Sequence, residues 1–243
     1  MAKVVAIASG KGGVGKTTTT LNLGVALGQL GKRVLVIDGD LAMGNAATLM
    51  GLPQLPATLH EVLSGEKRVG EAIYRVNGIS FLPSGPTLDG FLRSSPRKLE
   101  SLVKELSSRY DFILLDTPPG VSRYSLAPLA AAGEVLFILT PDPLALESTL
   151  KTQMVAEALE VKMGGAVLNR LPRSPFLGLF RKPKVLGVGE IERKLGLRVL
   201  VSIPEDQAVA ECAMMRKMLV LRKPKSPAAK AIRKLAVTLA GGS

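Results

Sequence analysis

The feature that most constrains this chain is a glycine-rich stretch at residues 9–20, SGKGGVGKTTTT. It matches the phosphate-binding pattern G-x-x-x-x-G-K-[ST], with Gly10 at the first fixed position and Gly15-Lys16-Thr17 at the last three. Glycines let successive backbone N–H groups turn toward one anion without a Cβ in the way. The apolar run at residues 3–8 predicts a buried strand before the stretch, and leucine spacing predicts a helix over residues 18–30 after it. A phosphate loop requires this order of strand, loop and helix.

Individual side chains in the stretch predict separate contacts with a nucleotide. Lys16 is expected to reach the β- and γ-phosphate oxygens, and the Thr17 hydroxyl is expected to ligate Mg²⁺. The residues predicted to bind nucleotide here are Gly10, Lys11, Gly12, Gly13, Val14, Gly15, Lys16, Thr17 and Thr18.

A second stretch, DFILLDTPPG at residues 111–120, ends a predicted buried strand in a carboxylate. In an open α/β sheet, the carboxyl end of such a strand faces the ligand crevice. Asp116 is therefore predicted to be an acid near Mg²⁺, acting through a water molecule. The other interpretation is that Asp116 only caps the end of its strand.

The rest of the chain alternates between predicted strands and helices. Strands are expected at residues 33–38, 78–83, 134–140, 164–168 and 198–203, and helices at 58–64, 97–109, 145–162 and about 226–240. This alternation predicts one α/β domain over residues 1–243, a doubly wound, mostly parallel sheet with helices on both faces. A hydrophobic content of 47% is enough for a large core.

Lys11 adds a second lysine beside the same phosphate loop, in the run Lys11-Gly12-Gly13-Val14-Gly15-Lys16-Thr17. At this point the sequence resembles the MinD/ParA family of P-loop ATPases, which carry the deviant loop K-G-G-x-G-K-[ST]. The resemblance covers about residues 2–240. The order of motifs, including the run IPED at residues 203–206, is closer to the MinD-type members.

The resemblance implies an ATPase that uses ATP and Mg²⁺, releases ADP and dimerises with ATP. Lys11 would point across the dimer interface to the partner's nucleotide, with Lys11, Lys16 and Asp40 as the catalytic residues. Residues 38–45 match the family's first switch, D-x-D-x-x-x-x-N. Asp40 would orient the attacking water there, or would lie in the second coordination shell of Mg²⁺ without touching that water. The metal set is then Thr17, Asp40 and Asp116.

Residues 117–120 resemble the second switch of the family. The resemblance also implies that Asn169 hydrogen-bonds the adenine edge, and that Pro204, Glu205 and Asp206 pack on the base. For each of these residues, a role in capping a loop is an equally open interpretation.

The net charge of +12 is unevenly distributed. Residues 1–169 hold 16 Lys and Arg against 15 Asp and Glu, whereas residues 170–243 hold 16 against 5. This asymmetry suggests a polyanionic partner, either nucleic acid or an anionic membrane surface. The alternative is a basic proteome with solvated lysines.

The cysteine content and the first residues of the chain indicate in which cellular compartment the protein is expected. With Cys212 as the single cysteine, an internal disulfide is excluded and iron–sulfur relatives, which need a cysteine pair, are disfavoured. The first residues run straight into the predicted strand, so no signal peptide is expected. We expect a cytoplasmic protein, with a peripheral position at the inner face of the membrane left open.

Two segments bear on membrane binding. The basic and apolar loop at residues 171–187 includes Phe176 and Phe180 among cations. It is consistent with dipping into an anionic interface, docking a partner protein or covering the chain's own core. The C-terminal helix at about 226–240 is either an anchor or a final helix packed on the sheet, and we expect the second.

These observations predict a MinD-like molecular switch, in cell-division-site placement or spatial positioning, with an activating partner protein. The alternative is a ParA-like chromosome or plasmid partitioning ATPase. It would bind DNA nonspecifically through the basic C-terminal third.

Overall fold

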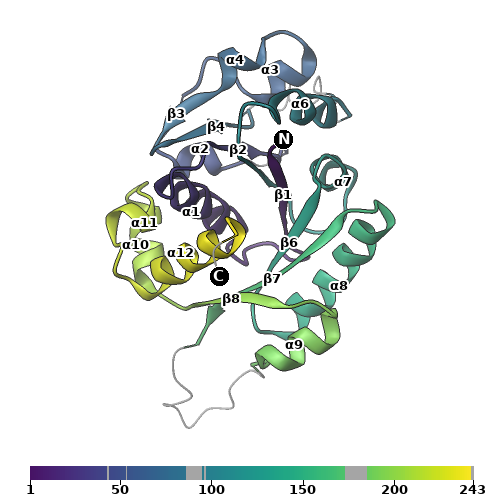
Figure 1. Ribbon diagram of the computed structural model, residues 1–243, viewed down its shortest axis with the longest axis vertical. Helices are drawn as coiled ribbons and strands as arrows, with labels where there is room; N and C mark the ends of the chain where they lie inside the picture. Colours follow the sequence, from purple (N-terminus) through teal and green to yellow (C-terminus); the bar gives the residue numbers. More distant parts are fainter. Residues whose placement is uncertain (43, 53, 86–94, 96, 173–184, 242–243) are drawn as a thin grey trace.

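The computed structural model describes residues 1–42, 44–52, 54–85, 95, 97–172 and 185–241. One eight-stranded sheet runs through these residues in the order β3-β4-β2-β5-β1-β6-β7-β8 (Figure 1). The strands are β1 (Lys3–Ala8), β2 (Val34–Asp38), β3 (Tyr74–Val76), β4 (Ile79–Leu82), β5 (Phe112–Asp116), β6 (Glu134–Leu139), β7 (Lys162–Leu171) and β8 (Val199–Pro204). All neighbours are parallel except β3 and β4. The predicted doubly wound, mostly parallel sheet is confirmed.

Helices connect the strands and cover both faces of the sheet. They are α1 (Lys16–Gln29), α2 (Ala46–Leu49), α3 (Leu59–Ser64), α4 (Val69–Ala72), α6 (Lys98–Leu106), α7 (Arg123–Ala130), α8 (Pro143–Ala158), α9 (Val188–Leu195), α10 (Gln207–Met214), α11 (Leu219–Arg222) and α12 (Pro227–Leu239). Figure 1 shows α1, α10, α11 and α12 on one side of the sheet and α7, α8 and α9 on the other. Parallel strands covered in this way are buried on both faces, which explains their continuous apolar sequences.

The core has one apolar cluster on each face of the sheet. Because successive side chains of a strand point to opposite faces, Val5 and Ile7 pack with α1 and α12, whereas Ala6 and Ala8 pack with α6, α7, α8 and α9. The predicted amphipathic helix at 97–109 is α6, and its stripe of Leu99, Leu102, Val103 and Leu106 is buried. The expected helix at 58–64 is α3, whose first turn is capped by the Thr58 hydroxyl.

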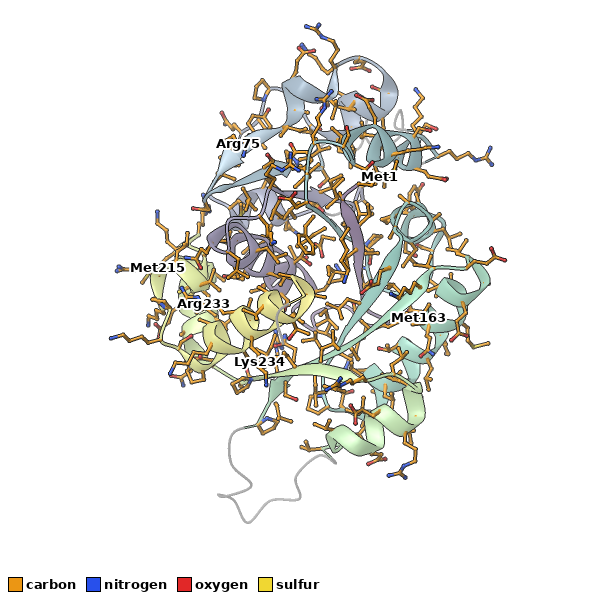
Figure 2. All side chains as sticks on the ribbon, in the orientation of Figure 1. Met1, Arg75, Met163, Met215, Arg233 and Lys234 are labelled. Carbon is orange, nitrogen blue, oxygen red and sulfur yellow. The ribbon has the colours of Figure 1, made fainter. Side chains whose placement is uncertain are left out.

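Helix α12 packs on the sheet as an integral part of the core. It begins after Ser226, whose side chain caps it by accepting a hydrogen bond from the Ala229 amide at 3.2 Å. Its apolar face is buried and comprises Ala228, Ala229, Ile232, Leu235, Ala236 and Leu239. Figure 2 shows its cationic residues Arg233 and Lys234 among the surrounding side chains. The interpretation as a packed final helix is confirmed for these residues.

Several predicted boundaries were wrong. The helix predicted at 145–162 begins at Pro143, because the Asp142 side chain caps it two residues earlier than the apolar pattern suggested. It ends at Ala158. The strand predicted at 164–168 is β7, which continues to Leu171 because it goes on pairing with β8 after a shift in register. Asn169 and Arg170 therefore lie within this strand and do not follow it.

The prediction for the basic and apolar loop at 171–187 is not tested, because residues 173–184 lie outside the described part of the chain.

The sequence analysis did not predict helices α7, α9 and α10. Helix α7 carries Pro128 in its interior, a residue that normally argues against a helix. No helix in the described residues is long and apolar enough to cross a bilayer.

Shortening a buried side chain of α12 should destabilise the whole domain. Leu235 is fully buried, so Leu235→Ala should lower the free energy of unfolding by about 2–5 kcal/mol, because it removes packing and leaves a cavity. Val237 on the same helix is 40% exposed, and Val237→Ala is the matched control with a much smaller effect. Urea unfolding curves measure both; equal, small effects would mean that α12 is not part of the cooperative core.

Candidate functional site

The glycine-rich loop joins the carboxyl end of β1 to the first turn of α1. Gly13 and Gly15 have φ values of 76° and 91°, a left-handed conformation that glycine adopts without a Cβ penalty. Gly15 is the N-cap of α1 and provides no side-chain cap for the helix amides. The helix N-terminus at Lys16 therefore presents backbone donors and positive dipole potential, the arrangement that binds phosphate groups.

Two glycines of the loop are required by close approaches from elsewhere in the chain. A Cβ on Gly10 would lie 2.0 Å from the backbone carbonyl carbon of Ser148 in α8. A Cβ on Gly15 would lie 2.3 Å from the Asn169 Nδ2 atom, which itself donates a hydrogen bond to the Val14 carbonyl at 2.7 Å. The loop is thus held between α8 on one flank and β7 on the other.

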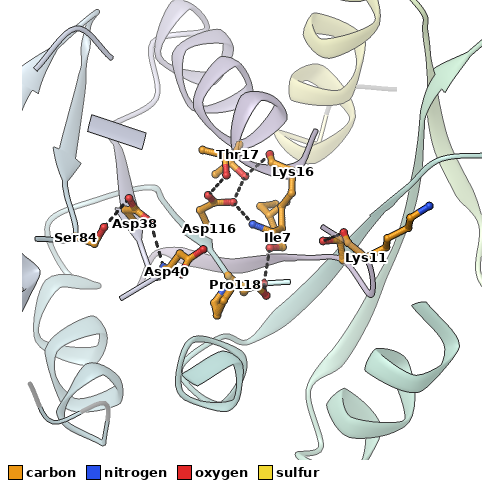
Figure 3. A network of polar contacts seen from close by, with 12 residues as sticks. Ile7, Lys11, Lys16, Thr17, Asp38, Asp40, Ser84, Asp116 and Pro118 are labelled. Carbon is orange, nitrogen blue, oxygen red and sulfur yellow. Dashed lines mark hydrogen bonds and ion pairs between the residues drawn. The ribbon is translucent and has the colours of Figure 1, made fainter. Parts of the chain in front are cut away.

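The Asp116 carboxylate joins β5 to the first turns of α1. Its Oδ1 atom lies 3.1 Å from Lys16 Nζ and accepts a hydrogen bond from the Thr20 hydroxyl at 3.1 Å. Its Oδ2 atom accepts from the Thr17 hydroxyl at 2.6 Å. Figure 3 shows Lys16, Thr17 and Asp116 meeting at this point. Asp116 and Lys16 are both buried, so each charge depends on the other for compensation.

This arrangement fits a magnesium nucleotide. A threonine hydroxyl next to a carboxylate supplies the oxygen ligands that Mg²⁺ prefers. The loop around Gly13 has room for an anion, because a Cβ there would meet nothing within 4 Å. Thr17 and Asp116 would hold the metal, and Lys16 with the loop amides would hold the phosphates. The structure brings these predicted residues together; their roles remain predictions.

The first switch begins at Asp38, the neighbour of Asp116 in the parallel pair of β2 and β5. Asp38 Oδ2 accepts from the Ser84 hydroxyl at 2.8 Å, and Oδ1 accepts from the Asp40 amide at 3.2 Å. Burial raises the pKa of Asp38 to about 7, and the negative charge of Asp116 adds to this effect. Asp40 follows Gly39, whose amide donates to the Asp116 carbonyl at 2.8 Å. The start of the predicted first switch therefore lies beside Asp116.

Lys11 faces away from the corner formed by Lys16 and Asp116 (Figure 3). Its side chain is 46% exposed and lies 3.7 Å from Asp142 Oδ1, measured from Nζ. Two apolar side chains near the same loop are also exposed, Val121 at 53% and Leu144 at 65%. Within one chain, the structure does not direct Lys11 toward the phosphate site of its own loop.

A pocket of about 310 Å³ extends from the phosphate loop past the carboxyl ends of β7 and β8. It brings together residues predicted to contact phosphate and residues predicted to contact adenine. Those predicted from the sequence are Gly15, Thr18, Asn169, Pro204, Glu205 and Asp206, and α10 closes the far wall. Asp206 also caps α10, since its Oδ1 atom accepts from the Ala208 amide at 3.1 Å. The capping interpretation is therefore correct for Asp206 in addition to its place in the pocket.

Several residues of this site were not predicted. Thr20 lies four residues after Lys16 on α1, and that helical spacing could have indicated it. Ser84 follows β4 at the same edge of the sheet as Asp38, but only the pairing of β2 with β4 brings the two together. His60 contacts the Leu41 carbonyl oxygen through Nε2 at 2.9 Å, a contact with no local sequence signal.

Comparison with known proteins identifies the family. The sequence matches the family described as AAA domain over residues 2–162. It is 36% identical to the cell division ATPase MinD of Pyrococcus furiosus, over 99% of both chains and with a TM-score of 0.92. The chain belongs to the MinD/ParA family of ATPases.

Other similar proteins agree with this assignment. An uncharacterized ATP-binding protein of Methanocaldococcus jannaschii is 38% identical, over 98% of this chain and 88% of that protein. MinD of Pyrococcus horikoshii, solved in complex with Mg-ADP, is 34% identical over 98% and 96% of the two chains, with a TM-score of 0.91. MinD of Aquifex aeolicus, solved in complex with MinC, is 27% identical over 100% of this chain and 97% of that one, with a TM-score of 0.86.

The raised pKa of Asp38 predicts a pH-dependent stability in the nucleotide-free protein. An unfolded aspartate titrates near 3.8, whereas Asp38 in the folded chain titrates near 7. Between these values only the folded state keeps the proton. Asp38 therefore contributes fully to the free energy of unfolding below about pH 4. As pH rises above this value, the contribution is lost, by up to about 1.4 kcal/mol per pH unit.

Asp38→Asn should remove this slope between pH 4.5 and 7 in urea unfolding curves. Asp111→Asn is the control, because the hydrogen bond from the Arg33 side chain lowers the pKa of Asp111 to about 2, outside this window. An unchanged slope in Asp38→Asn would contradict the assignment.

Proposed function

We propose that this chain is a MinD-like molecular switch that binds ATP with Mg²⁺, dimerises and hydrolyses ATP to ADP and phosphate. The convergence of Lys16, Thr17 and Asp116 at a glycine loop, with a base-sized pocket beside it, carries this proposal. Its biological role would be cell-division-site placement or spatial positioning. Its place would be the cytoplasm, with reversible binding at the inner face of the membrane.

The reaction is phosphoryl transfer to water, which depends on positioning and charge stabilisation more than on covalent help. Lys16 and the loop amides stabilise charge on the phosphates, and Thr17 with Asp116 holds Mg²⁺. Asp40 orients the attacking water from the first switch. Asn169 and the segment from Pro204 to Asp206 hold the base. The energy of hydrolysis is used to change the assembly state of the protein.

The surface around Lys11 supports ATP-dependent dimerisation. An exposed lysine and two exposed apolar side chains, Val121 and Leu144, lie on segments that border the phosphate loop. Exposed apolar side chains of this kind mark association surfaces when they gather near one site. In a dimer, Lys11 would supply positive charge to the partner's phosphates. The Aquifex MinC:MinD complex supports an activating or cargo partner protein as a further element of this proposal.

A ParA-like partitioning ATPase is the second candidate, and the charge distribution favours it. Of the charged residues after position 169, 16 are cationic and 5 anionic. Nonspecific DNA binding of this origin would weaken steeply as salt concentration rises, because it depends on counterion release.

Lys11→Ala should spare ADP binding and lose ATP-driven dimers. Removing the charge should lower turnover by about 10³-fold or more, as for an arginine finger supplied in trans. Lys67→Ala is a matched control, since Lys67 is also 46% exposed and lies 3.6 Å from Glu71. Size-exclusion chromatography with ATP and a phosphate-release assay measure both effects. Dimers of normal yield in Lys11→Ala would refute the role in trans.

Asp40→Ala should retain ATP binding and stop hydrolysis, leaving a persistent dimer. The loss in turnover should be about 10² to 10⁴-fold, the usual contribution of a residue that positions or deprotonates a nucleophile. Calorimetry checks the ATP affinity and phosphate release checks the rate. Wild-type turnover in this variant would remove Asp40 from the mechanism.

A further inference from the structure

Large apolar side chains are exposed to solvent at and beside the turn between α10 and α11. Four consecutive residues, Met214, Met215, Arg216 and Lys217, are exposed, with Met214 at 78% and Met215 at 59%. Leu221 on the following short helix is 43% exposed. Figure 2 shows Met215 projecting outward at the edge of the molecule. Large exposed apolar side chains this close together in the chain indicate a contact surface.

Helix α11, which follows the turn, is hydrogen-bonded to the body of the protein. The Val220 amide donates to Asn22 Oδ1 on α1 at 3.1 Å, and the Arg233 guanidinium on α12 donates to the Val220 carbonyl at 2.9 Å. Met218 and Leu219 are buried in the core between the exposed residues. The exposed methionines are therefore followed directly by residues that are buried in the core and hydrogen-bonded to α1 and α12.

Arg216 occupies a backbone position that favours glycine. Its φ is 53°, and its amide donates to the Ala213 carbonyl at 3.0 Å where α10 ends. Helices commonly end on a left-handed residue of this kind, and glycine is the usual choice because any side chain costs free energy there. The chain carries a cation at this position in spite of that cost.

The charges in this segment of the chain are mostly positive. Residues 206–225 hold five cations, Arg216, Lys217, Arg222, Lys223 and Lys225, and two carboxylates, Asp206 and Glu211. Glu211 is already paired with Lys223. The surface therefore combines protruding apolar groups with cations beside them.

We propose that the α10–α11 turn is a membrane-docking surface that inserts Met214, Met215 and Leu221 among anionic lipid headgroups. Each nearby cation should strengthen binding roughly fivefold by attraction to the negatively charged surface. The unbranched, flexible methionine side chains adapt to irregular acyl packing. Duplex DNA fits less well, because phosphate contacts would leave the three apolar side chains in water. The proposal deepens the proposed function by naming the surface on which the switch acts.

The location links this surface to the nucleotide site. Helix α10 lines the base pocket through Gln207, Val209, Ala210 and Ala213, and Met214 follows in the same helix. Asn22, which holds the turn, also donates to the Thr18 carbonyl at 2.9 Å in the first turn of α1. The docking surface is thus fixed to both walls of the pocket.

Sedimentation with vesicles tests the proposal on the full chain with ATP and Mg²⁺. The wild type should bind vesicles containing phosphatidylglycerol and not pure phosphatidylcholine. Met214→Ser with Met215→Ser should weaken binding about tenfold or more while keeping every charge. Arg216→Gly should weaken it roughly fivefold without loss of stability, because glycine relieves the left-handed backbone. Met154→Ser and Arg75→Gln, exposed residues on α8 and β3, are the matched controls and should bind as wild type.

Three outcomes would overturn the proposal. The first is that the wild type does not sediment with anionic vesicles. The second is that the methionine variant binds the vesicles as tightly as the wild type. The third is that the protein binds duplex DNA, and that Arg216→Gly weakens this binding whereas the methionine substitutions do not. ATP binding is measured on the same samples by calorimetry. If the wild type did not bind ATP, the proposed function would be refuted, whereas the vesicle measurement would still decide whether this surface binds membranes.

Discussion

One buried carboxylate holds the site together. Asp116 binds Lys16, Thr17 and Thr20 of α1 through its two oxygen atoms, and so ties the end of β5 to the helix that begins at the phosphate loop. A buried ion needs such partners, because an uncompensated charge would be expensive to remove from water. The conformation of a loop near residue 10 is therefore fixed by a side chain about 100 positions later. The arrangement of Lys16, Thr17 and Asp116 exists only when β5 and α1 are both in place.

The remaining parts of the site follow from the order of the strands. Strand β5 lies between β2 and β1, so Asp38 and Asp116 end as neighbours at one edge of the sheet. On the other side of β1, strands β7 and β8 carry Asn169 and Pro204 to the pocket of about 310 Å³. Ligands bind at such edges of open α/β sheets because loops there diverge and leave a crevice. The phosphate loop connects the two halves of this crevice.

Local patterns predicted what local chemistry determines. The glycine loop, the buried strands, Asp116 and the apolar face of α12 were all evident, because spacing and residue type alone specify them. The contact between Ser84 and Asp38 was not, since it depends on the pairing of β2 with β4. The length of β7 was also missed, because its continued pairing with β8 keeps Asn169 in a strand. The raised pKa of Asp38 likewise arises from burial and from a neighbouring strand.

The contact between Gly10 and α8 has a mechanical consequence. Backbone meets backbone there, with no room for even one carbon atom between Gly10 and Ser148. Such a contact transmits displacement directly, since no side chain can rotate to absorb it. If the loop shifted when the nucleotide gained or lost its γ-phosphate, α8 would have to move with it. Leu144 and Asp142, at the start of that helix, would then report the state of the nucleotide to whatever touches them.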